Sequence, residues 1–189
     1  MHMIKNSINK LIKNVTFVVF DLETTGLSYK HHKIVEVAAI KMKNGKVLKE
    51  YETLIWVNYI PYEATCIHGI TADMVKNAPD LETVSRHFRR FTKGCILVGH
   101  NVRRFDMQFA NKHFKIKLDH PHIDTIDLSK LHSPFARWHS LDDVIKRLFG
   151  RIVKKGRHTA MTDAKLTLKI FKVFLKKGGF KTLQDLEDY

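Results

Sequence analysis

The amino-acid sequence predicts one α/β domain in which helices flank a mixed central sheet. Segments rich in β-branched and aromatic residues occupy positions 15–22, 33–42 and 46–55, and Asn44-Gly45 joins the last two in a tight hairpin. Helical and extended segments alternate after that point. An antiparallel meander followed by such alternation predicts a sheet whose first three strands are antiparallel and whose later strands are added in parallel.

The remaining elements are marked by apolar periodicity and by residues typical of helix ends. The clearest helix has Leu81, Val84 and Phe88 on one face, with Asp80 as its expected N-cap and Gly94 after its last turn. The other expected elements are a short helix opened by Thr71 at 71–79, strands at 95–101 and 122–127, and helices at 103–114, 140–149 with a Ser140–Asp143 capping box, 159–177 and 182–189.

Length and charge indicate a globular domain with a basic surface. The 189 residues suffice for one hydrophobic core, and we expect an N-terminal extension at 1–14 and a single domain at 15–189. Lys and Arg number 33 against 19 Asp and Glu, and the net charge of +14 favours a polyanionic partner such as nucleic acid. A generally Lys-rich composition without such a partner is the alternative.

Cysteine content and hydropathy bear on the compartment. Cys66 and Cys95 are the only cysteines, which argues against a disulfide framework and for a reducing compartment, so we expect a cytoplasmic protein. No apolar run approaches the ~18 residues of a membrane span, and the apolar stretch near the N-terminus is too short for a signal peptide.

Two carboxylates interrupt the first apolar segment at its end. Asp21 and Glu23 are two positions apart, so on a strand they project from the same face. Two like charges this close raise each other's pKa, and a hard divalent cation would neutralise both. For an isolated pair, the alternative is that the strand simply ends in solvent, and Gly26 then begins a turn.

Two further carboxylates lie on apolar helical faces. Asp163 shares its face with Leu166 and Ile170, and Asp106 shares its face with Phe109. Each is also explained as a carboxylate that stabilises a helix N-terminus. Three separate segments that each present a carboxylate from an apolar face nevertheless favour a pair of divalent ions.

His158 precedes Asp163 by five residues, at the expected start of the same helix. A neutral imidazole at this point could take a proton from a metal-bound water. A surface or structural role is the alternative for one histidine among 12.

Four motifs, "FDLETTGL", "HGIT", "GHNVRRFD" and "RHTAMTDA", occur in the order and spacing of a known family. In these motifs the chain resembles the DnaQ-like 3′→5′ exonucleases of the DEDDh type, to which the exonuclease domain of the DNA polymerase III epsilon subunit belongs. The resemblance covers about residues 15–177. It implies an RNase H-like fold and phosphodiester hydrolysis that releases nucleoside 5′-monophosphates.

The resemblance also implies roles for the site residues. Two divalent cations, Mg²⁺ or Mn²⁺, would be bound: Asp21 would bridge both, Glu23 and Asp163 would complete the first site, and Asp106 would act near the second. His158 would deprotonate the attacking water. The residues implied to hold the terminal nucleotide are Thr24, Thr25, Leu27, His68, Asn101 and Phe105, with loop and strand-end packing as the alternative for His68 and Asn101.

Basic residues adjoin the implied site in two places. A segment directly before His158 could follow a nucleic-acid backbone. It contains Lys146, Arg147, Arg151, Lys154, Lys155 and Arg157. Lys165, Lys169, Lys172 and Lys176 form a stripe on the last long helix, for which a solvated face is the simpler explanation. Arg103 and Arg104 could contact phosphates or lie in solvent.

The substrate and biological role stay open between several functions. We expect hydrolysis of single-stranded or frayed 3′ ends, with DNA favoured and RNA as the alternative. A polymerase proofreading component, an RNA-trimming enzyme and a catalytically silent nucleic-acid-binding subunit are the other candidates. The intact acidic set disfavours the silent subunit, and the spacing of His158 and Asp163 disfavours an RNase H-type endonuclease. The chain ends about a dozen residues past its last long helix, without the tail that would support a polymerase partner.

Overall fold

A five-stranded mixed sheet forms the centre of the computed structural model, which describes residues 10–150 and 158–187. The strand order is β3-β2-β1-β4-β5. Strand β2 pairs in antiparallel fashion with both β1 and β3, and β4 pairs in parallel with both β1 and β5. The strand bounds are β1 Thr16–Thr24, β2 Ile34–Lys43, β3 Lys46–Leu54, β4 Ile96–Gly99 and β5 His122–Asp124. The predicted meander and its parallel additions are therefore confirmed.

The β2–β3 hairpin has the backbone that its Asn-Gly turn predicts. Asn44 and Gly45 have φ angles of 48° and 71°, in the left-handed region that these two residue types tolerate best. The turn places Lys43 opposite Lys46, and an irregularity between Lys41 and Met42 then shifts the register so that Ala38 faces Glu52.

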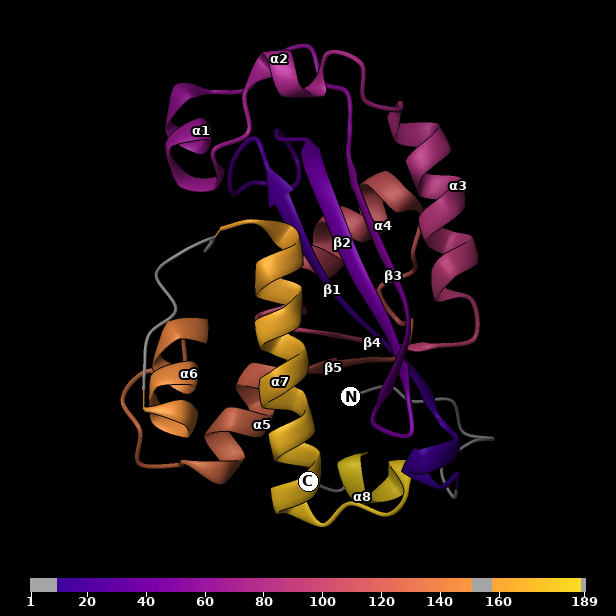
Figure 1. The fold of residues 1–189 in the computed structure, drawn as a ribbon, viewed down its shortest axis with the longest axis vertical. Coiled ribbons are helices and arrows are strands. Elements are labelled where there is room, and N and C mark those ends of the chain that lie inside the picture. Colours follow the sequence, from indigo (N-terminus) through magenta and orange to yellow (C-terminus); the bar gives the residue numbers. More distant parts are fainter. Residues whose placement is uncertain (1–9, 151–157, 188–189) are drawn as a thin grey trace.

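Helices cover both faces of the sheet (Figure 1). Alternating side chains of β1 serve two separate cores. Phe17 and Val19 belong to a core beneath α7 (Ala160–Gly178), and Val18 and Phe20 belong to a core beneath α3 (Leu81–Thr92). Other helices around the first core are α5 (Thr125–His132), α6 (Leu141–Phe149) and α8 (Leu183–Glu187). The second core also includes α4 (Asp106–Phe114).

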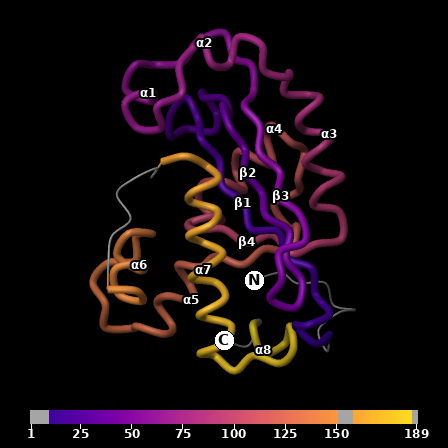
Figure 2. The backbone as a smooth tube through the Cα atoms, in the orientation of Figure 1, coloured from indigo at the N-terminus to yellow at the C-terminus, as the bar shows by residue number. Residues whose placement is uncertain are grey.

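Two short helices close the end of the sheet at which β1 finishes (Figure 1). They are α1 (Tyr62–His68) and α2 (Ala72–Val75), and a small apolar cluster packs them on Val35 of β2. At the opposite end, the 3₁₀ turn η1 (Ile12–Asn14) lies beside α8, where Leu11 forms a β-bridge with Thr182 (Figure 2).

The predicted helix caps are confirmed. The side chains of Thr71, Asp80 and Ser140 each accept a hydrogen bond from the backbone N–H three residues later, at the start of α2, α3 and α6. Gly150 and Gly179 take left-handed conformations after α6 and α7.

Four element predictions need correction. The helix expected at 71–79 is shorter, since α2 ends at Val75. Helix α1 was not expected at all, and residues 125–127 begin α5 instead of extending a strand, because Asp124 caps that helix through the N–H of Ile126. Helix α4 begins at Asp106 and not at residue 103, because the backbone turns at Asn101, whose φ is 62°. In the described ranges, no helix is long and apolar enough to cross a membrane.

Stability on the acid side is expected to depend on His132. Its ring stacks on Phe174 at a centroid distance of 5.1 Å, and burial lowers its pKa, with the charge of Lys177 acting in the same direction. The unfolded chain then takes up the proton first, so the free energy of unfolding falls as the pH decreases through about 6.5.

A His132→Phe variant should keep the stack and show a shallower loss of stability between pH 7 and pH 5. Urea denaturation of both proteins across this pH range measures the difference. Equal pH dependence in the two proteins would contradict the assignment.

Candidate active site

Asp21 and Glu23 continue the α7 face of β1 beyond its apolar part. Phe17 and Val19 occupy the same face within the core, so the two carboxylates stand where that core ends. Leu22 points to the opposite core. In the pairing with β2, Glu23 lies opposite Glu36.

Helix α7 brings Asp163 to the same place. Thr159 caps the helix by accepting a hydrogen bond from the N–H of Thr162 at 3.3 Å, and the N–H of Asp163 donates to the Thr159 carbonyl at 3.1 Å. The Asp163 side chain is buried at the start of the core-facing stripe, as predicted. The first turn of a helix also favours a negative charge at this position.

One carboxylate oxygen from each of Asp21, Glu23 and Asp163 lies within 4.8 Å of the other two. Within residues 10–150 and 158–187, this is the group of side chains with the spacing of a metal site. Its ligand atoms are all carboxylate oxygens, the type that Mg²⁺ and Mn²⁺ prefer. The donor set therefore fits a hard divalent cation.

Asp106 approaches this group from the opposite layer of the fold. It is buried at the first position of α4, and desolvation raises its pKa well above the usual range. The charges of Asp124 and Glu23 raise the pKa further, whereas hydrogen bonding to its own backbone and to that of Leu22 lowers it. Asp106 thus lies beside the end of β1, although it is not one of the three carboxylates within 4.8 Å.

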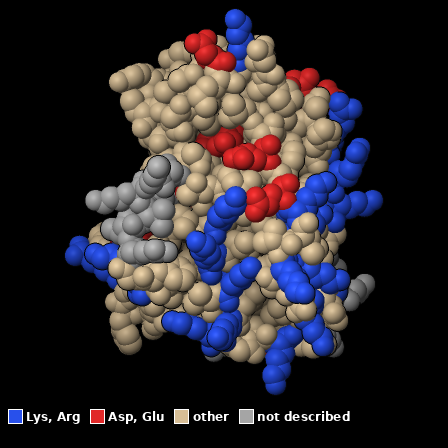
Figure 3. Space-filling model, viewed as in Figure 1, with Lys and Arg blue, Asp and Glu red and all other residues tan. Residues whose placement is uncertain are grey.

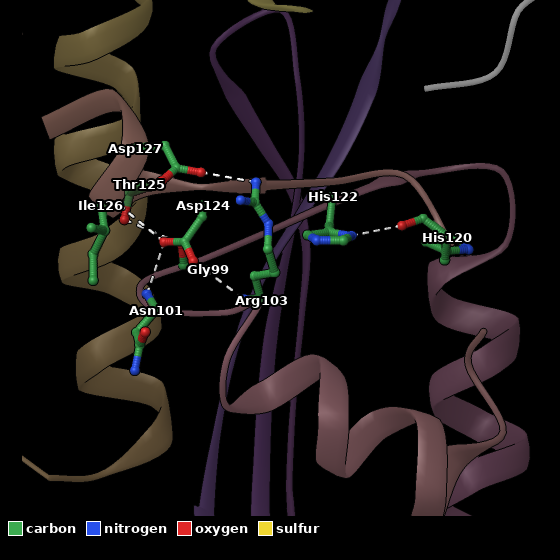
Figure 4. A network of polar contacts seen from close by, with 9 residues as sticks. All are labelled: Gly99, Asn101, Arg103, His120, His122, Asp124, Thr125, Ile126 and Asp127. Carbon is green, nitrogen blue, oxygen red and sulfur yellow. Dashed lines mark hydrogen bonds and ion pairs between the residues drawn. The ribbon is translucent and has the colours of Figure 1, made fainter. Parts of the chain in front are cut away.

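Asp124 holds the loop that leads from β4 to Asp106 (Figure 4). Its Oδ1 accepts hydrogen bonds from the N–H groups of Asn101 at 2.9 Å and Ile126 at 3.0 Å, and its Oδ2 accepts from the N–H of Arg103 at 3.2 Å. The Arg103 side chain pairs with Asp127 at 2.9 Å. Sequence reasoning missed Asp124 because it assigned 122–127 to one strand.

A cavity of about 430 Å³ opens next to Glu23. It is lined by five of the six residues predicted to hold the terminal nucleotide, namely Thr24, Thr25, Leu27, His68 and Phe105. Asn101, the sixth, is not one of its lining residues and lies in the loop held by Asp124. Leu27 is 84% exposed, whereas His68 is buried.

Hydrogen bonds fix the polar wall of this cavity. The Thr24 hydroxyl donates to the Gly26 carbonyl at 2.8 Å, and the Thr25 hydroxyl accepts from the N–H of Lys33 at 3.0 Å. Nδ1 of His68 accepts from the N–H of Ile70 at 3.0 Å. Burial lowers the pKa of His68, and an interaction with the Thr24 backbone opposes that shift.

The remaining wall comes from residues that sequence reasoning did not select. Helix α1 contributes Glu63, Ala64 and Ile67, and His32 packs over Gly26. A Cβ at Gly26 would lie 2.5 Å from Nε2 of His32, and the φ of 155° also disfavours residues with side chains, so glycine suits this turn best. The signal for α1 was present in Pro61 before the helix and Gly69 after it.

His158 stands directly before the N-cap of α7. It is exposed and has a φ of 61°, a left-handed conformation that is uncommon for residues other than glycine. Of the basic segment predicted before it, residues 151–157 lie outside the described part of the chain. Arg147 is described, and its guanidinium donates to the Trp138 carbonyl and to the Ser129 hydroxyl.

Acidic side chains gather over the strands beside the N-terminal end of α7, and basic side chains lie around and below them (Figure 3). Glu50 and Glu52 extend the acidic region across β3, since they pair in register with the core-facing Ile40 and Ala38. Lys165 of the α7 stripe forms an ion pair with Glu50 at 3.2 Å.

Known proteins share both the sequence and the fold of this chain. The chain is 36% identical to the PolC-type DNA polymerase III of Bacillus subtilis over 187 residues, which cover 95% of this chain and 13% of that protein. The PolC-type DNA polymerase III of Lacticaseibacillus paracasei is also 36% identical, over 94% of this chain and 13% of its own length.

Among solved structures, a complex of Escherichia coli ExoI with single-stranded DNA superposes with a TM-score of 0.75 at 19% identity, over 88% of this chain and 41% of that one. Exonuclease I of Methylocaldum szegediense gives a TM-score of 0.72 at 15% identity, over 87% and 41%. These neighbours confirm the RNase H-like fold. Residues 18–171 match the RNase_T family, described as exonuclease. The chain therefore belongs to the RNase_T exonuclease family, within the DnaQ-like exonucleases that its motifs resemble.

Proposed function

We propose that this chain is a metal-dependent 3′→5′ exonuclease that removes nucleoside 5′-monophosphates from single-stranded or frayed 3′ ends of DNA. The observation that carries the proposal is the position of Glu23. Its carboxylate belongs to the group formed with Asp21 and Asp163, and its residue also lines the cavity of about 430 Å³. A nucleotide in that cavity would have its phosphate beside the three carboxylates.

In this proposal, the carboxylates would hold two divalent ions. Asp21 would bind both, Glu23 and Asp163 would complete one site, and Asp106 would serve the second from the start of α4. Bound Mg²⁺ or Mn²⁺ stabilises the attacking and leaving oxygens of an in-line displacement at phosphorus. Without ions, the proximity of Asp21, Glu23 and Asp163 is unfavourable.

His158 would accept the proton of the attacking water. Water oxygen bonds to the phosphorus of the terminal nucleotide as the bond from phosphorus to the 3′-oxygen of the preceding nucleotide breaks. The 3′-oxygen takes up a proton and becomes the new 3′ end. His158 is exposed before α7, so water can reach its imidazole, which would act as the general base.

The cavity beside Glu23 would hold the terminal nucleotide. Thr24 and Thr25 form its polar wall, and His68 forms its buried floor. Leu27 and Phe105 are among its apolar lining residues, and either could contact a base. The volume fits a small ligand rather than a duplex.

A proofreading role within a DNA polymerase is a second candidate. It is favoured by the 36% identity to PolC-type DNA polymerase III over almost all of this chain. The same likeness favours DNA over RNA. The chain covers 13% of the length of that relative. Association with a polymerase is therefore part of this proposal.

Replacement of Asp21 should abolish the activity. Asp21→Ala removes the carboxylate that would bind both ions, and we expect 3′→5′ degradation of an end-labelled oligonucleotide in Mg²⁺ to fall on the order of 1000-fold. EDTA should have the same effect on the unaltered protein. DNA and RNA oligonucleotides of one sequence identify the preferred substrate.

The result that would overturn the mechanism is activity that survives both EDTA and Asp21→Ala. Cleavage of a circular single strand would indicate an endonuclease instead.

Replacement of His158 should separate catalysis from metal binding. His158→Ala removes the proposed base, so kcat is expected to fall by about 10²–10⁴-fold. Calorimetric titration with Mn²⁺ should show an affinity close to that of the unaltered protein. Loss of Mn²⁺ binding in this variant would identify His158 as a ligand and contradict its role as a base.

A further inference from the structure

One buried carboxylate beside the proposed site has no role in the mechanism above. Glu36 of β2 is 8% exposed and lies directly opposite Glu23 in the β1–β2 pairing. Its neighbours on the same face of β2 are Ala38 and Ile40, both fully buried in the core beneath α7. An acidic side chain on this otherwise apolar face requires an explanation.

The partner of Glu36 is the first residue of α7. Oε2 of Glu36 accepts a hydrogen bond from the N–H of Ala160 at 2.9 Å, across 124 residues of sequence. Ala160 is fully buried, and the first N–H groups of a helix have no partner within the helix. Glu36 therefore supplies an acceptor to a donor that would otherwise be buried without one, and its negative charge lies at the positive end of the helix dipole.

The hydrogen bond attaches α7 to the sheet at the point where the proposed chemistry takes place. Asp163 follows Ala160 by one turn, and His158 precedes it by two residues. The strand that carries Glu36 is paired with β1, which carries Asp21 and Glu23. The contact between Glu36 and Ala160 thus fixes the end of α7 relative to the two other carboxylates of the group.

A buried carboxylate has an energetic cost at this position. Burial raises the pKa of Glu36, as do the charges of Glu52 and Asp163, whereas the hydrogen bond from the N–H of Ala160 lowers it. An apolar side chain would avoid the cost of desolvation but would leave the buried N–H of Ala160 without this acceptor. A residue that is buried at such a cost next to a proposed active site typically orients the metal-binding residues without binding the metal itself.

We propose that Glu36 is a positioning residue, which holds the N-terminus of α7 so that Asp163 and His158 face Asp21 and Glu23. This inference rests on the proposed function. Glu36 does not bind the ions or the substrate in this role. Its effect passes through the backbone of Ala160.

The test compares Glu36→Ala, Glu36→Gln and the control Glu52→Ala. Glu52 lies on the same face of the sheet in β3 and is exposed, so its removal takes away a nearby negative charge without affecting the hydrogen bond to Ala160. Gln keeps an amide oxygen that can accept from Ala160 but has no charge.

Glu36→Ala is expected to lower kcat by about 10–100-fold and to weaken Mn²⁺ binding about tenfold, with KM for the oligonucleotide changed by less than about twofold. In Glu36→Gln, kcat and the affinity for Mn²⁺ should both lie within about threefold of the values of the unaltered protein. Glu52→Ala should change neither by more than about twofold.

Amide hydrogen exchange of the metal-free proteins gives a readout that does not depend on activity. The N–H of Ala160 should exchange about tenfold faster in Glu36→Ala and at the original rate in Glu52→Ala. If the unaltered chain has no nuclease activity, the proposed function fails, and exchange together with Mn²⁺ affinity still reports on Glu36.

Three results would overturn the proposal. One is an unchanged kcat and Mn²⁺ affinity in Glu36→Ala. Another is an equal loss in Glu36→Ala and Glu52→Ala, which would leave charge as the only effect. The third is a folded Glu36→Gln protein that is impaired by more than tenfold, and this variant decides the question even if Glu36→Ala does not fold.

Discussion

Repulsion between carboxylates at the end of β1 is the constraint on which the rest of this structure depends. Oxygens of Asp21, Glu23 and Asp163 lie within 4.8 Å of one another, and at such distances two charges repel by about 1–4 kcal/mol, depending on exposure to water. The fold holds the three carboxylates together against this repulsion. Two of the residues lie on a central strand, and the third lies on a helix packed against that strand. Bound cations would convert this repulsion into affinity.

Both faces of the sheet contribute residues to the proposed site. The face beneath α7 presents Asp21, Glu23 and Asp163, and the opposite face delivers Asp106 from the start of α4. On each side, a buried acid accepts hydrogen bonds from backbone N–H groups. Asp124 does so for the loop before α4, and Glu36 does so for the first residue of α7. The same chemistry, an acid that holds a loop or a helix end, thus appears on both sides of the proposed site.

Much of this arrangement could be predicted from sequence, because its signals are local. Alternation in β1, the Asn44-Gly45 turn and the capping residues each act within a few positions. Helix α1 escaped prediction because its seven residues bury only Ala64 and His68, too few for a periodic pattern. Glu36 and Asp124 escaped for another reason: the hydrogen bonds that define them reach partners 124 and up to 23 residues away.

The central claim is that the carboxylates at the end of β1 form a site for two cations. The most direct measurement is the number of Mn²⁺ ions bound at equilibrium, determined from the electron paramagnetic resonance signal of free Mn²⁺ during titration. Two ions are expected for the unaltered protein and none, over the same concentration range, for Asp21→Asn, since that carboxylate would contact both. Equal binding by the two proteins, or no binding by the unaltered one, would contradict the account.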